Sequence, residues 1–253
     1  MILLIVLLTI IVHMSLIWLW YRITNNPSVV DVGWALGLTL SGLIYLGQSS
    51  LSIRTVILGS ALLMWGSRLA GYLWWTRIRP KHIDKRYTAI SQSWTVKKPL
   101  GFFINFQLQG LFIFMVSISW YFISLSPATH INLIDLIGLI FFIFALGLES
   151  LADLQLLQFK KSHPGQVCNQ KLWRLSRHPN YFFEWLIWSS FTLFSLTAPY
   201  GLLSLFSPLV LYVIMAFITI PITERESLKS KGDAYLEYQS KTPAFFPKIS
   251  WFD

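Results

Sequence analysis

The chain has 253 residues, of which 55% are hydrophobic and 12% are charged. Soluble domains carry about one-quarter charged residues, so this composition excludes a soluble globular enzyme and indicates a protein surrounded mainly by lipid. The net charge is +9, and the lone Cys168 excludes a disulfide within the chain.

Seven apolar runs are long enough to cross a hydrocarbon core about 30 Å thick, which takes roughly 20 residues of helix. They cover residues 2 to 20, 29 to 48, 53 to 75, 101 to 125, 132 to 152, 181 to 197 and 201 to 221. The pattern predicts an all-α transmembrane bundle of about seven helices, folded as a single domain over residues 1–253. The first run has no Lys or Arg before it and no cleavage pattern after it, so we expect a retained helix rather than a signal peptide.

Basic residues alternate between the two ends of these predicted helices. The connections near residues 77 to 98, 160 to 177 and 225 to 248 are rich in Lys and Arg, whereas the intervening ones contain neither, and Arg54 is the exception. The positive-inside rule therefore predicts an outside N-terminus and a cytoplasmic C-terminus in a multi-pass protein of the bacterial inner membrane. Two explanations fit this concentration of positive charge. The basic residues set the topology and attract anionic lipid headgroups, or they form a pocket for a phosphate-bearing ligand, and composition leaves both open.

Polar residues inside apolar runs are costly and often functional. Asp31 begins the second run, where it suits either a helix start or a chemical role. Arg68 and Tyr72 share one face of the third run, with Arg68 about two turns inside it. Glu149 and Asp153 share a face of the fifth run, and two carboxylates at that spacing need a cation or hydrogen-bond donors between them.

The most specific motif covers residues 176 to 184. The proline after His178 favours a helix start there, which leaves Arg177 and His178 at the mouth of the helix and puts Asn180 and Glu184 on one face inside it. A helix N-terminus with these neighbours suits an anionic ligand, although a basic juxtamembrane turn is the simpler alternative. The five His residues occur singly, so the spacing predicts no metal site.

In this order the segments resemble the steroid 5-alpha-reductase family (3-oxo-5-alpha-steroid 4-dehydrogenases), especially its uncharacterised bacterial branch. More distantly they are similar to sterol reductases and isoprenylcysteine carboxyl methyltransferases. The resemblance starts near Asn25, is strongest over Ser176 to Glu184, and extends through Glu224 to Pro247. It implies a cavity open to the cytoplasm that holds NADPH.

The resemblance also implies site residues. Those expected to bind the cofactor are Arg68, Tyr72, Arg77, Arg79, Glu149, Asp153, Lys160, Arg177, His178, Asn180, Tyr181, Glu184, Glu224, Tyr235 and Tyr238. The steroid enzymes polarise the substrate carbonyl with a Glu and a Tyr, but here Trp65 stands where the Tyr belongs and Asp31 is nearest to the Glu. We therefore expect Asp31, as a neutral acid, or Tyr72 to be catalytic, and we do not expect steroid specificity.

The resulting hypothesis is an NADPH-dependent reductase of a carbon-carbon double bond conjugated to a carbonyl, in a steroid-like or isoprenoid substrate. Arginines after the third helix favour a phosphate-rich cofactor over S-adenosylmethionine, so a methyltransferase of the isoprenylcysteine carboxyl type is the alternative. A non-enzymatic lipid-binding or scaffold protein is a third. We expect a monomer whose partners are a lipophilic small molecule and membrane lipid, with no nucleic acid.

Overall fold

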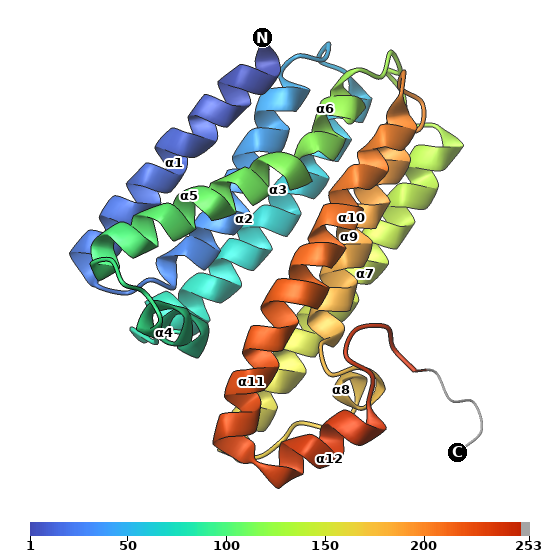
Figure 1. The fold of residues 1–253 in the computed structure, drawn as a ribbon. Coiled ribbons are helices and arrows are strands. Elements are labelled where there is room, and N and C mark those ends of the chain that lie inside the picture. Colours follow the sequence, from blue (N-terminus) through green and yellow to red (C-terminus); the bar gives the residue numbers. More distant parts are fainter. Residues whose placement is uncertain (249–253) are drawn as a thin grey trace. The chain divides into compact units, whose positions relative to one another are not determined.

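The computed structural model describes residues 1–248, which form helices and connecting segments with no strand in that range (Figure 1). The elements are α1 (Ile2–Thr24), α2 (Val29–Leu46), α3 (Ile53–Leu73), η1 (Trp74–Ile78), α4 (Lys85–Gln92), α5 (Lys98–Val116), α6 (Ile118–Ser124), α7 (Leu133–Ser162), α8 (Leu172–Leu175), α9 (Pro179–Ser195), η2 (Gly201–Leu205), α10 (Phe206–Val213), η3 (Ile214–Thr219), α11 (Ile220–Lys231) and α12 (Asp233–Lys241). The predicted all-α class is confirmed.

Within the described residues, six helical stretches are long and apolar enough to cross a membrane, which is consistent with the predicted integral membrane protein. They are Ile2–Thr24, Val29–Leu46, Ile53–Ile78, Lys98–Ser124, Leu133–Ser162 and Gly201–Lys231. The remaining predicted run, residues 181 to 197, forms α9, but α9 has only 17 residues. At about 1.5 Å per residue it is about 26 Å long, slightly shorter than the hydrocarbon core. The number of crossings and their orientation stay predictions.

The chain divides into two compact units, each considered by itself below. Unit 1 comprises Met1–Ile137 and Phe191–Val210, and unit 2 comprises Gly138–Ser190 and Leu211–Asp253. Helices α7, α9 and α10 begin in one unit and end in the other. The single-domain expectation stays a prediction.

Helices α1, α2, α3 and α5 of unit 1 pack against one another through small residues. A Cβ added to Gly66 on α3 would collide with the side chain of Thr39 on α2, so the two helices approach closely at this point. Thr39 donates its hydroxyl to the Ala35 carbonyl 2.8 Å away, so this polar side chain is satisfied within its own helix. Close approach at small residues is how helices gain packing energy in lipid, where no hydrophobic driving force brings them together.

The Arg54 side chain, which the positive-inside rule leaves on the wrong side, is buried in an ion pair with Asp135. Nε and Nη2 lie 2.8 and 2.9 Å from the two carboxylate oxygens, and the two side chains are 1% and 0% exposed. Arg54 also donates to the carbonyl of Phe194, and Asn132 donates to Asp135 at 2.8 Å. The pair thus joins the start of α3, the start of α7 and the last turn of α9 within unit 1.

We predict that Arg54→Met lowers the free energy of unfolding by about 3–5 kcal/mol, because it leaves the Asp135 carboxylate buried without its cation. The double variant Arg54→Met/Asp135→Leu should recover most of the loss, since an apolar pair of similar volume replaces both charges. Unfolding by sodium dodecyl sulfate in mixed micelles measures both. The control is Arg225→Met, at an exposed position, which should change stability by less than about 0.5 kcal/mol. Equal stability of the Arg54 and Arg225 variants would contradict the prediction.

Candidate functional site

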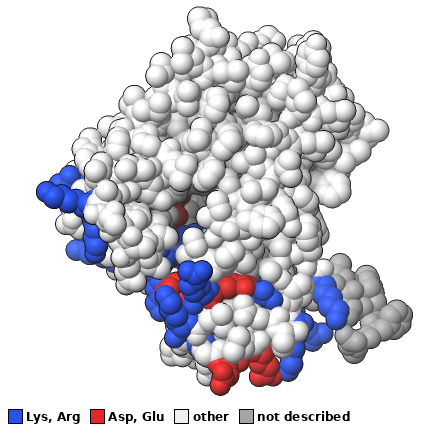
Figure 2. Space-filling model, viewed as in Figure 1, with Lys and Arg blue, Asp and Glu red and all other residues white. Residues whose placement is uncertain are grey.

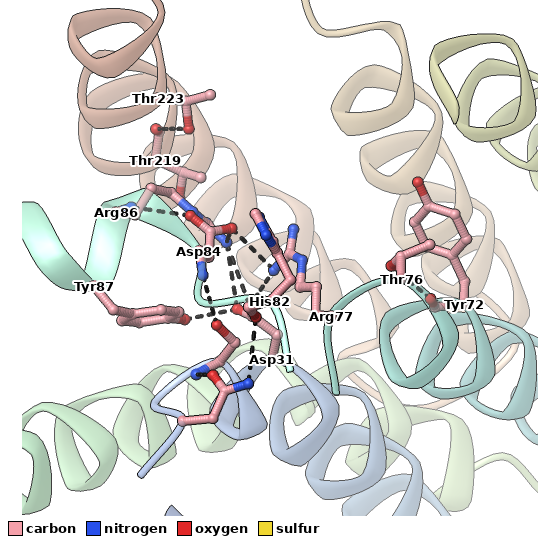
Figure 3. A network of polar contacts seen from close by, with 12 residues as sticks. Asp31, Tyr72, Thr76, Arg77, His82, Asp84, Arg86, Tyr87, Thr219 and Thr223 are labelled. Carbon is pink, nitrogen blue, oxygen red and sulfur yellow. Dashed lines mark hydrogen bonds and ion pairs between the residues drawn. The ribbon is translucent and has the colours of Figure 1, made fainter. Parts of the chain in front are cut away.

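The first polar cluster, in unit 1, is centred on Asp31 in the first turn of α2 (Figure 3). Arg77 of η1 forms an ion pair with one carboxylate oxygen, and Nη2 of Arg86 lies 3.4 Å from the other. The hydroxyl of Tyr87 donates to that second oxygen at 2.6 Å. Three donors from two later segments of the chain therefore converge on one carboxylate.

Asp84 contributes a second carboxylate to this cluster. It caps the N-terminus of α4 by accepting from the Arg86 amide at 3.0 Å, and it also accepts from the Arg86 guanidinium at 2.9 and 3.0 Å. Its own amide donates to the Ser28 hydroxyl at 2.8 Å. Burial would raise the pKa of Asp84, but the guanidinium groups of Arg86 and Arg77 outweigh it and hold this pKa well below its ordinary value.

Arg77 reaches this cluster from a π-helical turn, η1, which covers Trp74–Ile78. Such wide turns often occur at functional sites, and this one carries Arg77. The guanidinium of Arg79, just beyond it, lies 3.9 Å from the centre of the Trp75 ring. Arg68 lies over Tyr72 at 5.7 Å.

The two residues predicted to be catalytic are not brought together. Tyr72 lies apart from the Asp31 cluster in Figure 3, and Tyr87 occupies the place beside Asp31. The Tyr87 hydroxyl donates to Asp31, so Tyr87 is the neutral donor of the cluster. Burial, reinforced by Asp31, raises the pKa of Tyr87 well above its ordinary value, and the phenol keeps its proton.

In unit 2, all three guanidinium nitrogens of the motif residue Arg177 donate to protein oxygens. Nε and Nη2 lie 2.7 and 3.1 Å from the carboxylate oxygens of Glu224 on α11. Nη1 donates to the carbonyls of Gln239, at 3.1 Å, and of Thr242. Arg177 therefore ties α11 and the end of α12 to the start of α9, and its donors are committed to protein acceptors.

His178 shares the same carboxylate. Its Nε2 lies 3.0 Å from Glu224 Oε1, and its ring stacks on Tyr181 with 5.3 Å between ring centres. Burial lowers the pKa of His178, and the hydrogen bond to Glu224 only partly opposes this effect. His178 is therefore a neutral donor.

The predicted tyrosines Tyr235 and Tyr238 belong to the core of unit 2. The Tyr238 hydroxyl donates to the carbonyl of Trp173, and the two tyrosine rings pack edge to face with 5.8 Å between centres. Nearby, the Ser176 hydroxyl donates to the Phe245 carbonyl at 2.9 Å. These bonds hold the C-terminal segment against α8.

A second polar cluster of unit 2 joins α7 to α9. Asn180 donates through Nδ2 to Asp153 Oδ1 at 3.2 Å, and this contact fixes the amide orientation because a carboxylate only accepts. Asn180 Oδ1 is buried and accepts no hydrogen bond from residues 1–248. Glu149, Asp153 and Glu184 are also buried, and Glu184 accepts from Trp188 at 3.1 Å. A buried amide oxygen beside carboxylates needs a donor, and a ligand with hydroxyl or amide hydrogens would supply one.

The remaining cofactor candidate of unit 2, Lys160, is exposed near the end of α7. Sequence reasoning missed Asp84, Tyr87 and Gln239, and it counted Arg86 only as topological charge. The one available signal was the Asp84 side chain, because Asp before a short amphipathic segment is a helix N-cap. No group of three His, Cys, Asp or Glu residues among residues 1–248 is arranged to hold a metal ion.

A family model described as "Protein of unknown function (DUF1295)" matches residues 17–242. An uncharacterized protein of Schizosaccharomyces pombe is 29% identical over 266 aligned positions, covering 89% of this chain and 74% of the relative. No solved structure matches the chain.

We predict that Arg177→Met destabilises the protein by on the order of 3 kcal/mol, because Glu224 loses the cation that pairs with it. Arg174→Met, three positions earlier and exposed, should change the free energy of unfolding by less than about 0.5 kcal/mol. Thermal unfolding in detergent compares the two. If Arg177→Met unfolds like the wild type, Arg177 does not join the elements of unit 2.

Stability should also fall in acid through His178. The folded-state pKa of His178 lies below the unfolded value near 6.5, so its contribution is complete above about pH 6.5 and is lost as pH falls through the folded pKa. His178→Gln keeps a donor without a titrating ring and should flatten the decline of the unfolding midpoint between about pH 7 and pH 5. The exposed His163→Gln should leave the decline unchanged. Identical pH profiles for wild type and His178→Gln would refute the assignment.

Proposed function

Since this chain belongs to the DUF1295 family, which is steroid 5-alpha-reductase-like in general, we propose that it is an NADPH-dependent membrane reductase. Its substrate is a lipophilic steroid-like or isoprenoid compound with a carbon-carbon double bond conjugated to a carbonyl. NADPH, when bound, supplies the hydride to that double bond. The finer resemblance, to the uncharacterised bacterial branch of the family, is part of the proposal.

The observation that supports this proposal best is Asn180 Oδ1, a buried acceptor with no donor among the described residues. Ribose hydroxyls and the nicotinamide amide are donors of the kind that it lacks, and the carboxylates of Asp153 and Glu184 accept from the same groups. The hydrogen-bond acceptors of unit 2 therefore fit the hydroxyl and amide donors of a nucleotide cofactor. Lys160, seven positions after Asp153 on α7, supplies an exposed cation.

Reduction of such a substrate builds negative charge on the carbonyl oxygen, which a positioned donor must stabilise. In unit 1 the Tyr87 hydroxyl donates its single hydrogen to Asp31 at 2.6 Å, so Tyr87 can donate to a carbonyl oxygen only when that hydrogen turns away from Asp31. We assign the polarising role to Tyr87, whose hydrogen would pass from Asp31 to the substrate oxygen when substrate binds, and Asp31 holds the phenol in place until then. Tyr72 remains a candidate for the same role.

Arg77 and Arg86 do not support a preference for NADPH. Arg77 and Arg86 are ion-paired with Asp31 and Asp84, so they are not free to meet phosphate groups. Their charge therefore does not favour NADPH over S-adenosylmethionine as the cofactor. A methyltransferase that uses S-adenosylmethionine is the competing function.

The test measures the binding of NADPH, NADH and S-adenosylmethionine to detergent-purified protein by calorimetry. We predict saturable NADPH binding that is tighter than NADH binding, because the exposed cation of Lys160 favours the extra 2′-phosphate. Asn180→Ala should weaken NADPH binding roughly ten-fold or more through loss of one buried hydrogen bond.

The matched control is Asn105→Ala on α5, where the Asn105 side chain accepts from Gln109 at 2.8 Å. This variant should bind NADPH as the wild type does. Binding of S-adenosylmethionine without NADPH would replace the reductase by the methyltransferase. Absence of binding by either compound would refute both enzymes.

A further inference from the structure

A pocket of about 700 Å³ lies in unit 2, between the segment of residues 165–175 and helix α12. None of the carboxylates discussed above lines it, and Tyr238 is its one lining residue among those expected to bind cofactor. The Tyr238 hydroxyl already donates to the Trp173 carbonyl, so Tyr238 forms a wall of the pocket rather than a ligand contact. This pocket is therefore separate from the Asn180 cluster.

The lining of the pocket is strongly cationic. Its basic side chains are Arg174, Lys231, Lys241 and Lys248, and its acidic one is Glu237. Lys241 neutralises Glu237 through a contact of 2.6 Å between Nζ and Oε1. Arg174 and Lys248 form no ion pair within residues 1–248 and are exposed. A concave surface with this excess of positive charge concentrates anions.

Residues that line the pocket lie at the ends of two candidate membrane spans. The span Leu133–Ser162 ends just before Gly165 of the lining, and the span Gly201–Lys231 ends at Lys231, which itself lines the pocket. On the face shown in Figure 2, coloured charged atoms of unit 2 lie at the end that carries α12, and the surface over α10 is white. With 30 and 31 residues these helices are about 45 Å long, which matches a bilayer of about 40–45 Å with its headgroups included, so their ends reach the outer headgroup region.

We propose that this pocket binds the phosphate-bearing headgroup of an anionic phospholipid. Arg174 presents paired donors that match phosphate oxygens, and the lysines supply point charges on flexible stems. Basic residues beside a membrane attract anionic lipid in general. A pocket adds what a flat basic surface lacks, namely a saturable site that depends on particular side chains.

The probe is phosphatidylglycerol added to the full chain in mixed micelles, with phosphatidylcholine as the neutral lipid and the thermal unfolding midpoint as the readout. The unfolding midpoint of the wild-type protein should rise with phosphatidylglycerol until it saturates, and it should not change with phosphatidylcholine. Arg174→Gln/Lys248→Gln should raise the half-saturating concentration on the order of ten-fold, since two of four cations are removed. Both positions are exposed, so the midpoint without added lipid should be unchanged.

The control Lys161→Gln/Arg225→Gln removes the same charge from exposed positions of unit 2 outside the pocket and should respond like the wild type. Equal weakening of both double variants would overturn the proposal in favour of diffuse surface attraction. A response to inorganic phosphate or to NADPH that depends on Arg174 and Lys248, without one to phosphatidylglycerol, would assign the pocket to a soluble phosphate compound and overturn it too. The readout needs no NADPH, so a lipid response persists if the proposed reductase fails.

Discussion

Charge burial in a protein made mostly of apolar helices constrains the rest of this structure. An isolated ion is very costly away from water, so each buried cation must meet a carboxylate and each remaining donor must meet an oxygen. The buried pair of Arg54 with Asp135 meets this requirement, and so do the partly buried pairs of Arg77 with Asp31 and Arg177 with Glu224. In each pair the partners come from different helices or turns, so satisfying the charge also fixes how those elements pack.

The same constraint separates polar residues whose hydrogen-bonding groups are satisfied within the protein from those that can still bind a ligand. Arg177 and His178 look like ligand groups at a helix mouth, but both are committed to Glu224 and hold the C-terminal helices in place. Asn180 differs, because its amide oxygen is buried and lacks a donor among the described residues. An unsatisfied buried acceptor is a stronger indication of a ligand than a satisfied cation, since the native state would otherwise bear its desolvation cost.

The proposed cofactor residues and the proposed lipid pocket use different chemistry in different parts of unit 2. Around Asn180 the side chains are carboxylates and an amide, which suit hydroxyl and amide donors. Around Arg174 they are cations at the ends of two candidate membrane spans, which suit phosphate at headgroup depth. Family membership by itself assigns neither set of residues, because the family is described as one of unknown function.

Local features of the sequence were enough to predict the helical class and six of the runs that form long apolar helices. Hydropathy and length act within about 20 residues, and Pro179 starts α9 because its fixed backbone angle suits a first helical turn. Pairing of side chains depended on the tertiary structure. Asp135 lies 81 positions after Arg54, and Tyr87 lies 56 positions after Asp31. No local pattern indicates such partners, because a hydrogen bond is decided by where helices and turns bring two atoms within about 3 Å.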